Sequence, residues 1–196
     1  KRQCMHCLEP ACMKVCPQKA ILVNENGAVV RDYDKCVGCQ YCAAACPFHI
    51  PRYNKETDKE TKCSLCTERT AEGELPACVK ACITGALQYG DRDELLAIAR
   101  KRVSELKADN PQANVYGEDQ VGGTNILYVL ADAPSKYGFE ENPKIPTAIH
   151  AWQDIIKPYF PWLIALTGAV SVFSFFSTRL LGVGKEEAHE GESVDG

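Results

Sequence analysis

The twelve cysteines of this 196-residue chain all lie before residue 83, in three groups of four. Each group begins with a Cys-x2-Cys pair, and its last two cysteines are separated by three residues. The members are Cys4, Cys7, Cys12 and Cys16, then Cys36, Cys39, Cys42 and Cys46, and finally Cys63, Cys66, Cys78 and Cys82. Such regular spacing predicts metal ligation, because disulfide frameworks seldom require a repeated Cys-x2-Cys pair.

The second group has the spacing C-x2-C-x2-C-x3-C-P, which is a bacterial ferredoxin run for a [4Fe-4S] cubane. A tight loop with this spacing presents three thiolates to one small volume. The last cysteine points away as the chain turns helical, and in two-cluster ferredoxins it binds the neighbouring cluster. We therefore expect one [4Fe-4S] cluster on Cys4, Cys7, Cys12 and Cys46, and a second on Cys36, Cys39, Cys42 and Cys16.

The third group does not complete a cluster by this rule. Cys63, Cys66 and Cys78 need a fourth ligand, Cys82 belongs to another cluster, and no further cysteine follows. Because Lys1 is not a methionine, we expect an upstream segment with one more four-cysteine motif, which would give four cubanes in all. A local site that uses all four cysteines of the third group is the alternative.

Zinc is the other metal to weigh, above all for the third group taken alone. The x3-Cys-Pro endings of the first two groups favour iron–sulfur clusters. A nucleic-acid zinc module would need a basic face, whereas this chain has 22 Lys plus Arg against 26 Asp plus Glu, a net charge of −4. We expect no nucleic-acid partner, and a zinc-binding scaffold at a membrane surface is the alternative from a different functional class.

Local patterns predict an α+β fold. The run from Ile21 to Val30, interrupted by Asn24-Glu25-Asn26-Gly27, predicts a hairpin. Capping-box spacing predicts a helix that begins at Asp91. Residues 111–123 are predicted to be loop, 126–130 a buried strand and 137–146 an irregular connector. The apolar stripe expected of the helix is Leu95, Leu96, Ile98, Ala99, Val103 and Leu106, while Arg92, Arg100, Lys101 and Lys107 should mostly face water.

Residues 158–178 contain no charged side chain, and Arg179 follows them. At about 1.5 Å per residue they span about 31 Å, close to the ~30 Å hydrocarbon core of a bilayer. We predict one transmembrane helix, with a buried soluble helix as the alternative. Its hydroxyl residues, which would meet a partner helix or their own backbone carbonyls, are Thr167, Ser171, Ser174 and Thr178. The span has no histidine to bind haem, so it is expected to be an anchor and not a cytochrome.

The sequence resembles the four-cluster iron–sulfur subunits of membrane-bound molybdenum or tungsten oxidoreductases, and most closely the beta subunits of respiratory formate dehydrogenases. The resemblance covers nearly all of residues 1–181. It departs at the absent first motif and at Ile83, where proline is common. The runs that carry it are Cys46–Glu56, Lys62–Cys66, Pro76–Lys80, Gly122–Thr124 and Tyr128–Leu130.

The resemblance implies a wire of four [4Fe-4S] clusters from a catalytic subunit to a membrane cytochrome b, with the cluster domain on the periplasmic side of the inner membrane. A hydrogenase-associated iron–sulfur subunit is the alternative. We find no nucleophile–base pair, phosphate loop or dinucleotide fingerprint, so no catalytic site is expected in this chain. The expected domains are 1–90 (ferredoxin-like), 91–146 (mixed extension), 147–182 (pre-membrane segment and anchor) and 183–196 (acidic disordered tail).

Charged and aromatic neighbours of the cysteines are also candidates for a role. Lys14, Lys35 and Lys62 are cations that could offset the negative charge of the clusters, or simply solvated surface residues. His6 and His49 lie close to ligand cysteines, but with complete cysteine sets we expect neither of them to bind metal.

Overall fold

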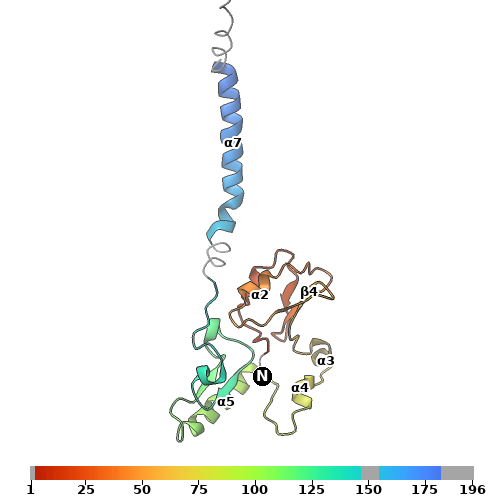
Figure 1. Ribbon diagram of the computed structural model, residues 1–196, viewed down its shortest axis with the longest axis vertical. Helices are drawn as coiled ribbons and strands as arrows, with labels where there is room; N and C mark the ends of the chain where they lie inside the picture. Colours follow the sequence, from red (N-terminus) through yellow and green to blue (C-terminus); the bar gives the residue numbers. More distant parts are fainter. Residues whose placement is uncertain (1–2, 147–154, 182–196) are drawn as a thin grey trace, which may run out of the picture. The chain divides into compact units, whose positions relative to one another are not determined.

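A computed structural model describes residues 3–146 and 155–181 of the chain (Figure 1). The chain divides into two compact units, Lys1–Ile149 and His150–Gly196. The predicted acidic tail, 183–196, and most of the predicted pre-membrane segment lie outside the described residues.

The first unit combines short helices with three two-stranded antiparallel sheets, so the predicted α+β class is confirmed. Its elements are α1 Ala11–Lys14, β1 Ile21–Val23, β2 Val29–Arg31, α2 Tyr41–Ala45, β3 Arg52–Asn54, β4 Lys59–Thr61, α3 Thr67–Ala71, α4 Ala77–Lys80, α5 Arg92–Leu106, β5 Asn114–Tyr116, η1 Gln120–Gly122, β6 Tyr128–Leu130 and η2 Pro134–Tyr137. The second unit contains α7, Lys157–Leu181.

The predicted hairpin is confirmed as β1 paired with β2, in the register Ile21↔Arg31 and Val23↔Val29. Gly27 has a φ of +74° and its amide donates to the Asn24 carbonyl at 2.9 Å, so glycine suits this turn. Ile21 and Val29 are buried together with Cys42. Since α1 contacts both β1 and α2, the hairpin holds the two cysteine-bearing helices together.

A second hairpin, β3–β4, was not predicted from the sequence. It pairs Arg52 with Thr61 and Asn54 with Lys59, and Asp58 in its turn has a φ of +54°. The sequence carries no Asn-Gly or Asp-Gly signal at this turn. The hairpin matters for the cysteines because it leads directly into Lys62 and Cys63.

The predicted helix is confirmed as α5, and the Asp91 side chain accepts hydrogen bonds from the Asp93 and Glu94 amides at 2.8 and 3.3 Å. Leu96, Ala99 and Val103 are buried, as the stripe predicted. Two details were wrong. Ile98 is 53% exposed, and Arg92 is partly buried, because its Nε donates to the Thr124 carbonyl at 3.0 Å.

The predicted strand at residues 126–130 is confirmed in its last part, β6, of which only Leu130 is buried. Its partner β5 lies inside the segment predicted to be loop, so that prediction was wrong for residues 114–116. The strand was missed because Asn114-Val115-Tyr116 is too short to show an alternation of apolar and polar residues.

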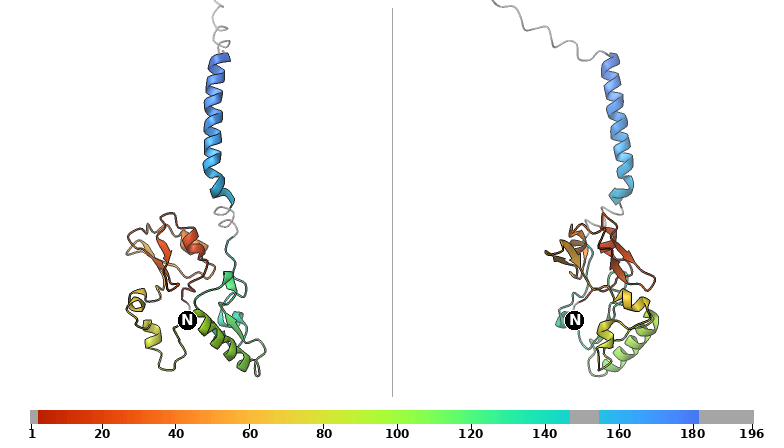
Figure 2. Two further views of the ribbon diagram at one scale, coloured as in Figure 1. Left: turned by 180° about the vertical axis from the view of Figure 1, so that it is seen from behind. Right: turned by 90° about the vertical axis from the view of Figure 1, so that its right-hand side faces the viewer.

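The extension packs directly on the first cysteine loop. Backbone hydrogen bonds run from Leu8 N to Gly123 O (3.0 Å), from Asn125 N to His6 O (3.0 Å) and from Ile126 N to Met5 O (3.2 Å). Met5 shares a core with Tyr116 and Leu130. All the views show this green and cyan part of the chain beside the red N-terminal part (Figure 2). The extension therefore fixes the backbone on which Cys4 and Cys7 are carried.

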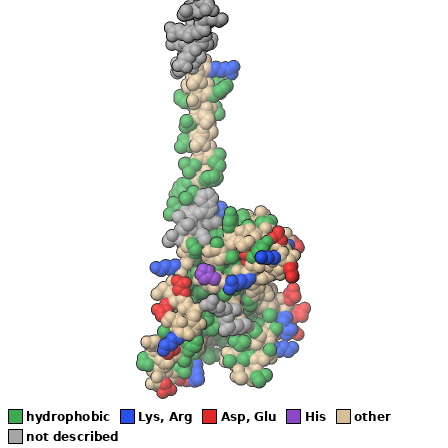
Figure 3. Space-filling view, in the orientation of Figure 1, with side chains coloured by type: hydrophobic (Ala, Val, Ile, Leu, Met, Phe, Trp, Pro, Cys, Tyr) green, Lys and Arg blue, Asp and Glu red, His purple; other side chains and the backbone are tan. Residues whose placement is uncertain are grey.

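Helix α7 is long and apolar enough to cross a membrane. Within Lys157–Leu180, a window of 18 residues has a mean hydropathy of 1.6, and none of that window is buried. Hydrophobic side chains are spread along the visible face of the helix (Figure 3). The hydroxyls of Thr167 and Ser171 donate to the carbonyls of Ile164 (2.9 Å) and Thr167 (2.8 Å). Of the two alternatives for the helix hydroxyls, these bonds favour hydrogen bonding to the carbonyls of their own helix over contact with a partner helix.

Asp91→Ala should weaken the first turn of α5 by about 1 kcal/mol, because two amides lose their acceptor. Native-state hydrogen exchange should show roughly fivefold faster exchange of the Asp93 and Glu94 amides. Asp93→Ala is the control, since the Asp93 side chain is 92% exposed and forms a long ion pair with Arg92, at 3.8 Å. Equal acceleration in the two variants would contradict the capping role.

Candidate metal centres in the cysteine region

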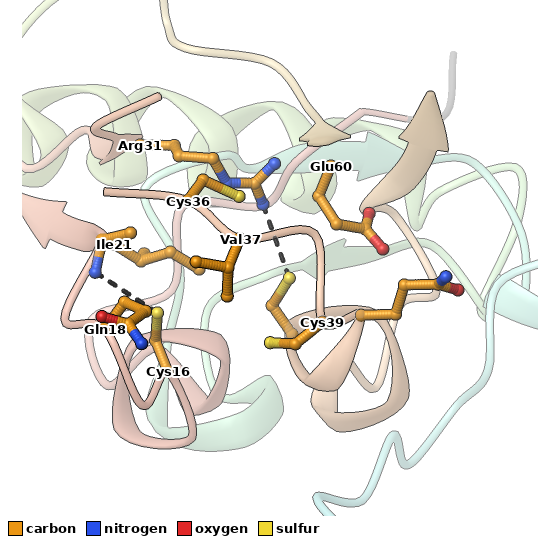
Figure 4. A pocket seen from close by; sticks show the side chains of 11 residues that line it. Cys16, Gln18, Ile21, Arg31, Cys36, Val37, Cys39 and Glu60 are labelled. Carbon is orange, nitrogen blue, oxygen red and sulfur yellow. Dashed lines mark hydrogen bonds between the residues drawn. The ribbon is translucent and has the colours of Figure 1, made fainter. Parts of the chain in front are cut away.

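One cavity brings together cysteines from two different groups (Figure 4). Cys16, which follows α1, lines it together with three cysteines of the second group, and the enclosed space, including its open side, is about 330 Å³. The remaining lining residues are Gln18, Ala20, Ile21, Arg31, Val37, Gln40 and Glu60, with Cys36, Cys39 and Cys42 as the second-group cysteines. This combination is the one that the sequence analysis assigned to the second cluster.

Four other thiols act on one another electrostatically. Burial raises the pKa of Cys7 to about 12, and negative charge on Cys4, Cys12 and Cys46 adds to the effect. Burial likewise raises the pKa of Cys12 to about 12, with Cys4 contributing and Lys62 opposing. Cys46 comes from the second group, so the structure again brings the last cysteine of one group to the first three of the other.

These donor sets fit an iron–sulfur cluster. Buried thiols with raised pKa values stay protonated unless a cation takes their protons' place, which is what metal ligation does. Among the described residues, no three or more His, Cys, Asp or Glu side chains are grouped closely enough to hold one metal ion. A cubane binds its four thiolates through four different irons, so its ligands stand further apart than those of a single zinc ion.

The three Cys-x2-Cys loops share one backbone feature. The residue before the second cysteine has a positive φ in each case, 47° at His6, 67° at Gly38 and 59° at Leu65. A left-handed residue at such a position lets successive amides face the same concavity, which suits an anion. In the third loop the Leu65 amide donates to the Cys63 sulfur at 3.4 Å.

The turns after the last cysteine of each group also repeat. Lys19, His49 and Gly85 each lie three residues after that cysteine, with φ values of 50°, 51° and 67°. Their amides donate to the carbonyls of Cys16, Cys46 and Cys82 at 3.2, 3.1 and 3.1 Å. The next amide in the first turn, that of Ala20, reaches the Cys16 sulfur at 3.3 Å.

The second half of the third group has the same local structure as the second half of the first group. Pro10-Ala11-Cys12-Met13-Lys14-Val15-Cys16 and Pro76-Ala77-Cys78-Val79-Lys80-Ala81-Cys82 share five residues at matching positions. Their hydrogen bonds also match, since Val15 N donates to Ala11 O at 3.1 Å and Ala81 N donates to Ala77 O at 3.0 Å. The surroundings differ. Ile21, five residues after Cys16, is 2% exposed, whereas Leu87, at the matching position after Cys82, is 37% exposed.

Only one of the three lysines considered from the sequence donates towards a cysteine sulfur. Lys14 pairs with Glu9 at 3.2 Å and Lys35 with Asp32 at 2.8 Å, both at the surface. Lys62 is partly buried, and its Nζ lies 3.7 Å from the Cys4 sulfur.

The two histidines near ligand cysteines have different surroundings. His6 is fully buried, and its Nδ1 accepts a hydrogen bond from the Val29 amide at 2.9 Å. Burial, assisted by the charge of Lys62, lowers the pKa of His6 to about 3. His49 is exposed.

Two charged residues that line the cavity of Cys16, Cys36, Cys39 and Cys42 were not predicted from the sequence. The Arg31 Nη2 donates to the Cys42 sulfur at 3.5 Å. Glu60 is 1% exposed, and neither of its carboxylate oxygens has a hydrogen-bond partner. Burial raises the pKa of Glu60, and the charge of Arg31 opposes that shift. Alternation along β4 could have pointed to Glu60, but the β3–β4 hairpin itself was not recognised.

The chain is similar in sequence to known iron–sulfur proteins. Residues 1–92 match the family profile described as a 4Fe-4S dicluster domain. The whole chain is 41% identical to the iron–sulfur subunit of the nitrate-inducible formate dehydrogenase of Escherichia coli K12, and 98% of it is 43% identical to the formate dehydrogenase-O iron–sulfur subunit of the same strain. The hydrogenase-2 operon protein HybA of Escherichia coli O157:H7 matches 68% of the chain at 38% identity.

The fold, the paired cysteine sites and the dicluster match define a ferredoxin-type iron–sulfur protein. The chain belongs to the family of formate dehydrogenase iron–sulfur subunits, as its sequence resemblance predicted, and its hydrogenase relatives are more distant. It spans 66% of the length of the first of these relatives, 64% of the second and 49% of the third.

Gly38→Ala should disrupt the second site. Gly38 has a φ of +67°, and a methyl group there would overlap the Asp58 carbonyl in the β3–β4 turn. We expect less iron and acid-labile sulfide per chain, measured chemically. Gly73→Ala is the matched control, because Gly73 has a φ of +77° with no neighbour within 4 Å and so incurs only the backbone cost of about 1–2 kcal/mol. Equal iron loss in the two variants would contradict a role specific to the Cys36–Cys39 loop.

Proposed function

We propose that this chain conducts electrons within a membrane-bound formate dehydrogenase, from a catalytic molybdenum or tungsten subunit to a membrane cytochrome b. The observation that carries the proposal is the shared cavity of Cys16 with Cys36, Cys39 and Cys42. Two peptide segments that each supply ligands to the other's site form two adjacent centres, which is the arrangement an electron relay requires.

The proposed ligand sets follow the two observed groupings. One cluster is bound by Cys4, Cys7, Cys12 and Cys46, and the other by Cys36, Cys39, Cys42 and Cys16. When bound, [4Fe-4S] clusters exchange single electrons at potentials set by charge, hydrogen bonds to sulfur and solvent exposure. The chain supplies those factors through the Ala20 amide at Cys16, Arg31 at Cys42 and Lys62 at Cys4.

The third group is proposed to bind clusters of the same kind. Cys63, Cys66 and Cys78 would hold a third cluster together with one cysteine from outside these residues, and Cys82 would complete a fourth. Support comes from the backbone that this group shares with the first, including the left-handed Leu65 and the matched turn at Gly85. The alternative is a closed four-cysteine zinc site formed by the third group alone.

The proposed position in the membrane rests on α7. An uncharged run flanked by Lys157 and Arg179 is suited to a single membrane pass that anchors the chain. The cluster domain would lie on the periplasmic side, as its family resemblance implies, next to the catalytic subunit. In this proposal the chain contributes no residue to the oxidation of formate, which takes place in its partner.

A complex purified through this chain should contain iron and acid-labile sulfide, and should pass electrons from formate to an artificial acceptor. The metals are measured by elemental analysis, and the activity by acceptor reduction with formate or hydrogen as donor. Activity with hydrogen alone would assign the chain to a hydrogenase. Stoichiometric zinc in a colourless sample would overturn the electron-transfer proposal.

In the proposed arrangement, which we call crossed ligation, the last cysteine of each of the first two groups binds the cluster of the other group. This arrangement makes a separate prediction about single cysteine variants. Cys16→Ser should lose the same electron paramagnetic resonance component as Cys39→Ser, because both residues serve one cluster. Cys7→Ser should remove a different component, together with Cys46→Ser. Each variant should also broaden the other signal, because each cluster holds both segments together. Loss of the same component in Cys16→Ser and Cys7→Ser would contradict crossed ligation.

A further inference from the structure

Lys62 lies between two of the cysteine groups. Its Nζ donates to the Cys63 carbonyl at 3.1 Å and to the Val29 carbonyl, and it lies 3.7 Å from the Cys4 sulfur. Cys4 belongs to the first proposed cluster and Cys63 to the third. We propose that Lys62 is the electrostatic control residue of the first cluster, a fixed positive charge that raises the reduction potential of that cluster. The inference rests on the ligand sets proposed above.

The position of the ammonium group is set by the fold. Val29 is buried in β2 and Cys63 begins the third group, so the two carbonyl acceptors belong to different parts of the unit. A flexible lysine held by two carbonyls and a sulfur has little freedom to move away into solvent. The charge therefore stays beside Cys4, where the partly buried setting screens it less than water would.

Lys62 is not neutralised by a carboxylate. No ion pair found in residues 3–146 includes it, whereas Lys14 and Lys35 are each paired with an acidic residue. A reduced cluster is one unit more negative than an oxidised one, so a nearby unpaired cation favours reduction.

Arg31 provides the internal comparison. It donates to Cys42 of the second site, but it shares that cavity with the buried Glu60, so its charge is not alone there. Lys62 and Arg31 thus belong to different clusters, and removing each charge should affect a different signal. A residue that only supports the fold would not produce such a separation.

The test is a redox titration of the whole purified complex, followed by electron paramagnetic resonance, with the second-cluster signal identified by its loss in Cys39→Ser. Lys62→Gln keeps a hydrogen-bond donor but removes the charge. At a fixed solution potential, we expect it to shift the oxidised-to-reduced ratio of the first cluster about tenfold towards oxidised, or about 59 mV for one electron. Lys62→Arg should keep the wild-type value, and Arg31→Gln should shift only the second cluster. Lys14→Gln is the control for a paired surface lysine and should shift neither.

The outcomes separate the two proposals. Samples without iron and sulfide would overturn the proposed function itself. Clusters present in full, with the first-cluster potential unchanged in Lys62→Gln, would overturn only the role of Lys62. Two other results would also contradict the role of Lys62. One is an equal shift of the first-cluster and second-cluster reduction potentials in Lys62→Gln. The other is a first-cluster potential that falls as far in Lys62→Arg as in Lys62→Gln.

Discussion

The cysteine region depends on one constraint, the cost of burying thiolates, which lose their hydration and also repel one another. Cys7 and Cys12 have pKa values raised to about 12 by burial and by the charges of neighbouring cysteines. A folded chain can hold such groups together as thiolates only around a cationic core. The metal centres are therefore part of what stabilises this unit, as well as what gives it a function.

The rest of the first unit supports the cysteine-bearing loops, although it has little hydrophobic core. Most of its helices have four or five residues, and each of its sheets has two strands. Elements this short are marginal in isolation. The extension compensates, because its backbone pairs with Met5, His6 and Leu8, and Tyr116 packs against Met5. Crossed ligation would add covalent ties between the two segments that the β1–β2 hairpin already joins.

Much of this arrangement could be predicted because its signals are local. Cysteine spacing indicated the cluster class, Asn-Gly indicated the first hairpin, and Asp91 with Glu94 indicated the start of α5. What could not be predicted depends on contacts between distant segments. Arg31 and Glu60 line the cavity of Cys16, Cys36, Cys39 and Cys42 because they lie on the β1–β2 and β3–β4 hairpins. The strands of these hairpins have three residues each, which is too few to show a pattern. The exposure of Ile98 likewise depends on which face of α5 the short β5–β6 sheet covers.

Anomalous diffraction from crystals of the complex, recorded above and below the iron absorption edge, tests the central claim most directly. Crossed ligation predicts one iron peak surrounded by the sulfurs of Cys4, Cys7, Cys12 and Cys46, and a second surrounded by those of Cys16, Cys36, Cys39 and Cys42. A peak that joins Cys16 to Cys4, Cys7 and Cys12, or anomalous scattering at the zinc edge in place of the iron edge, would contradict it.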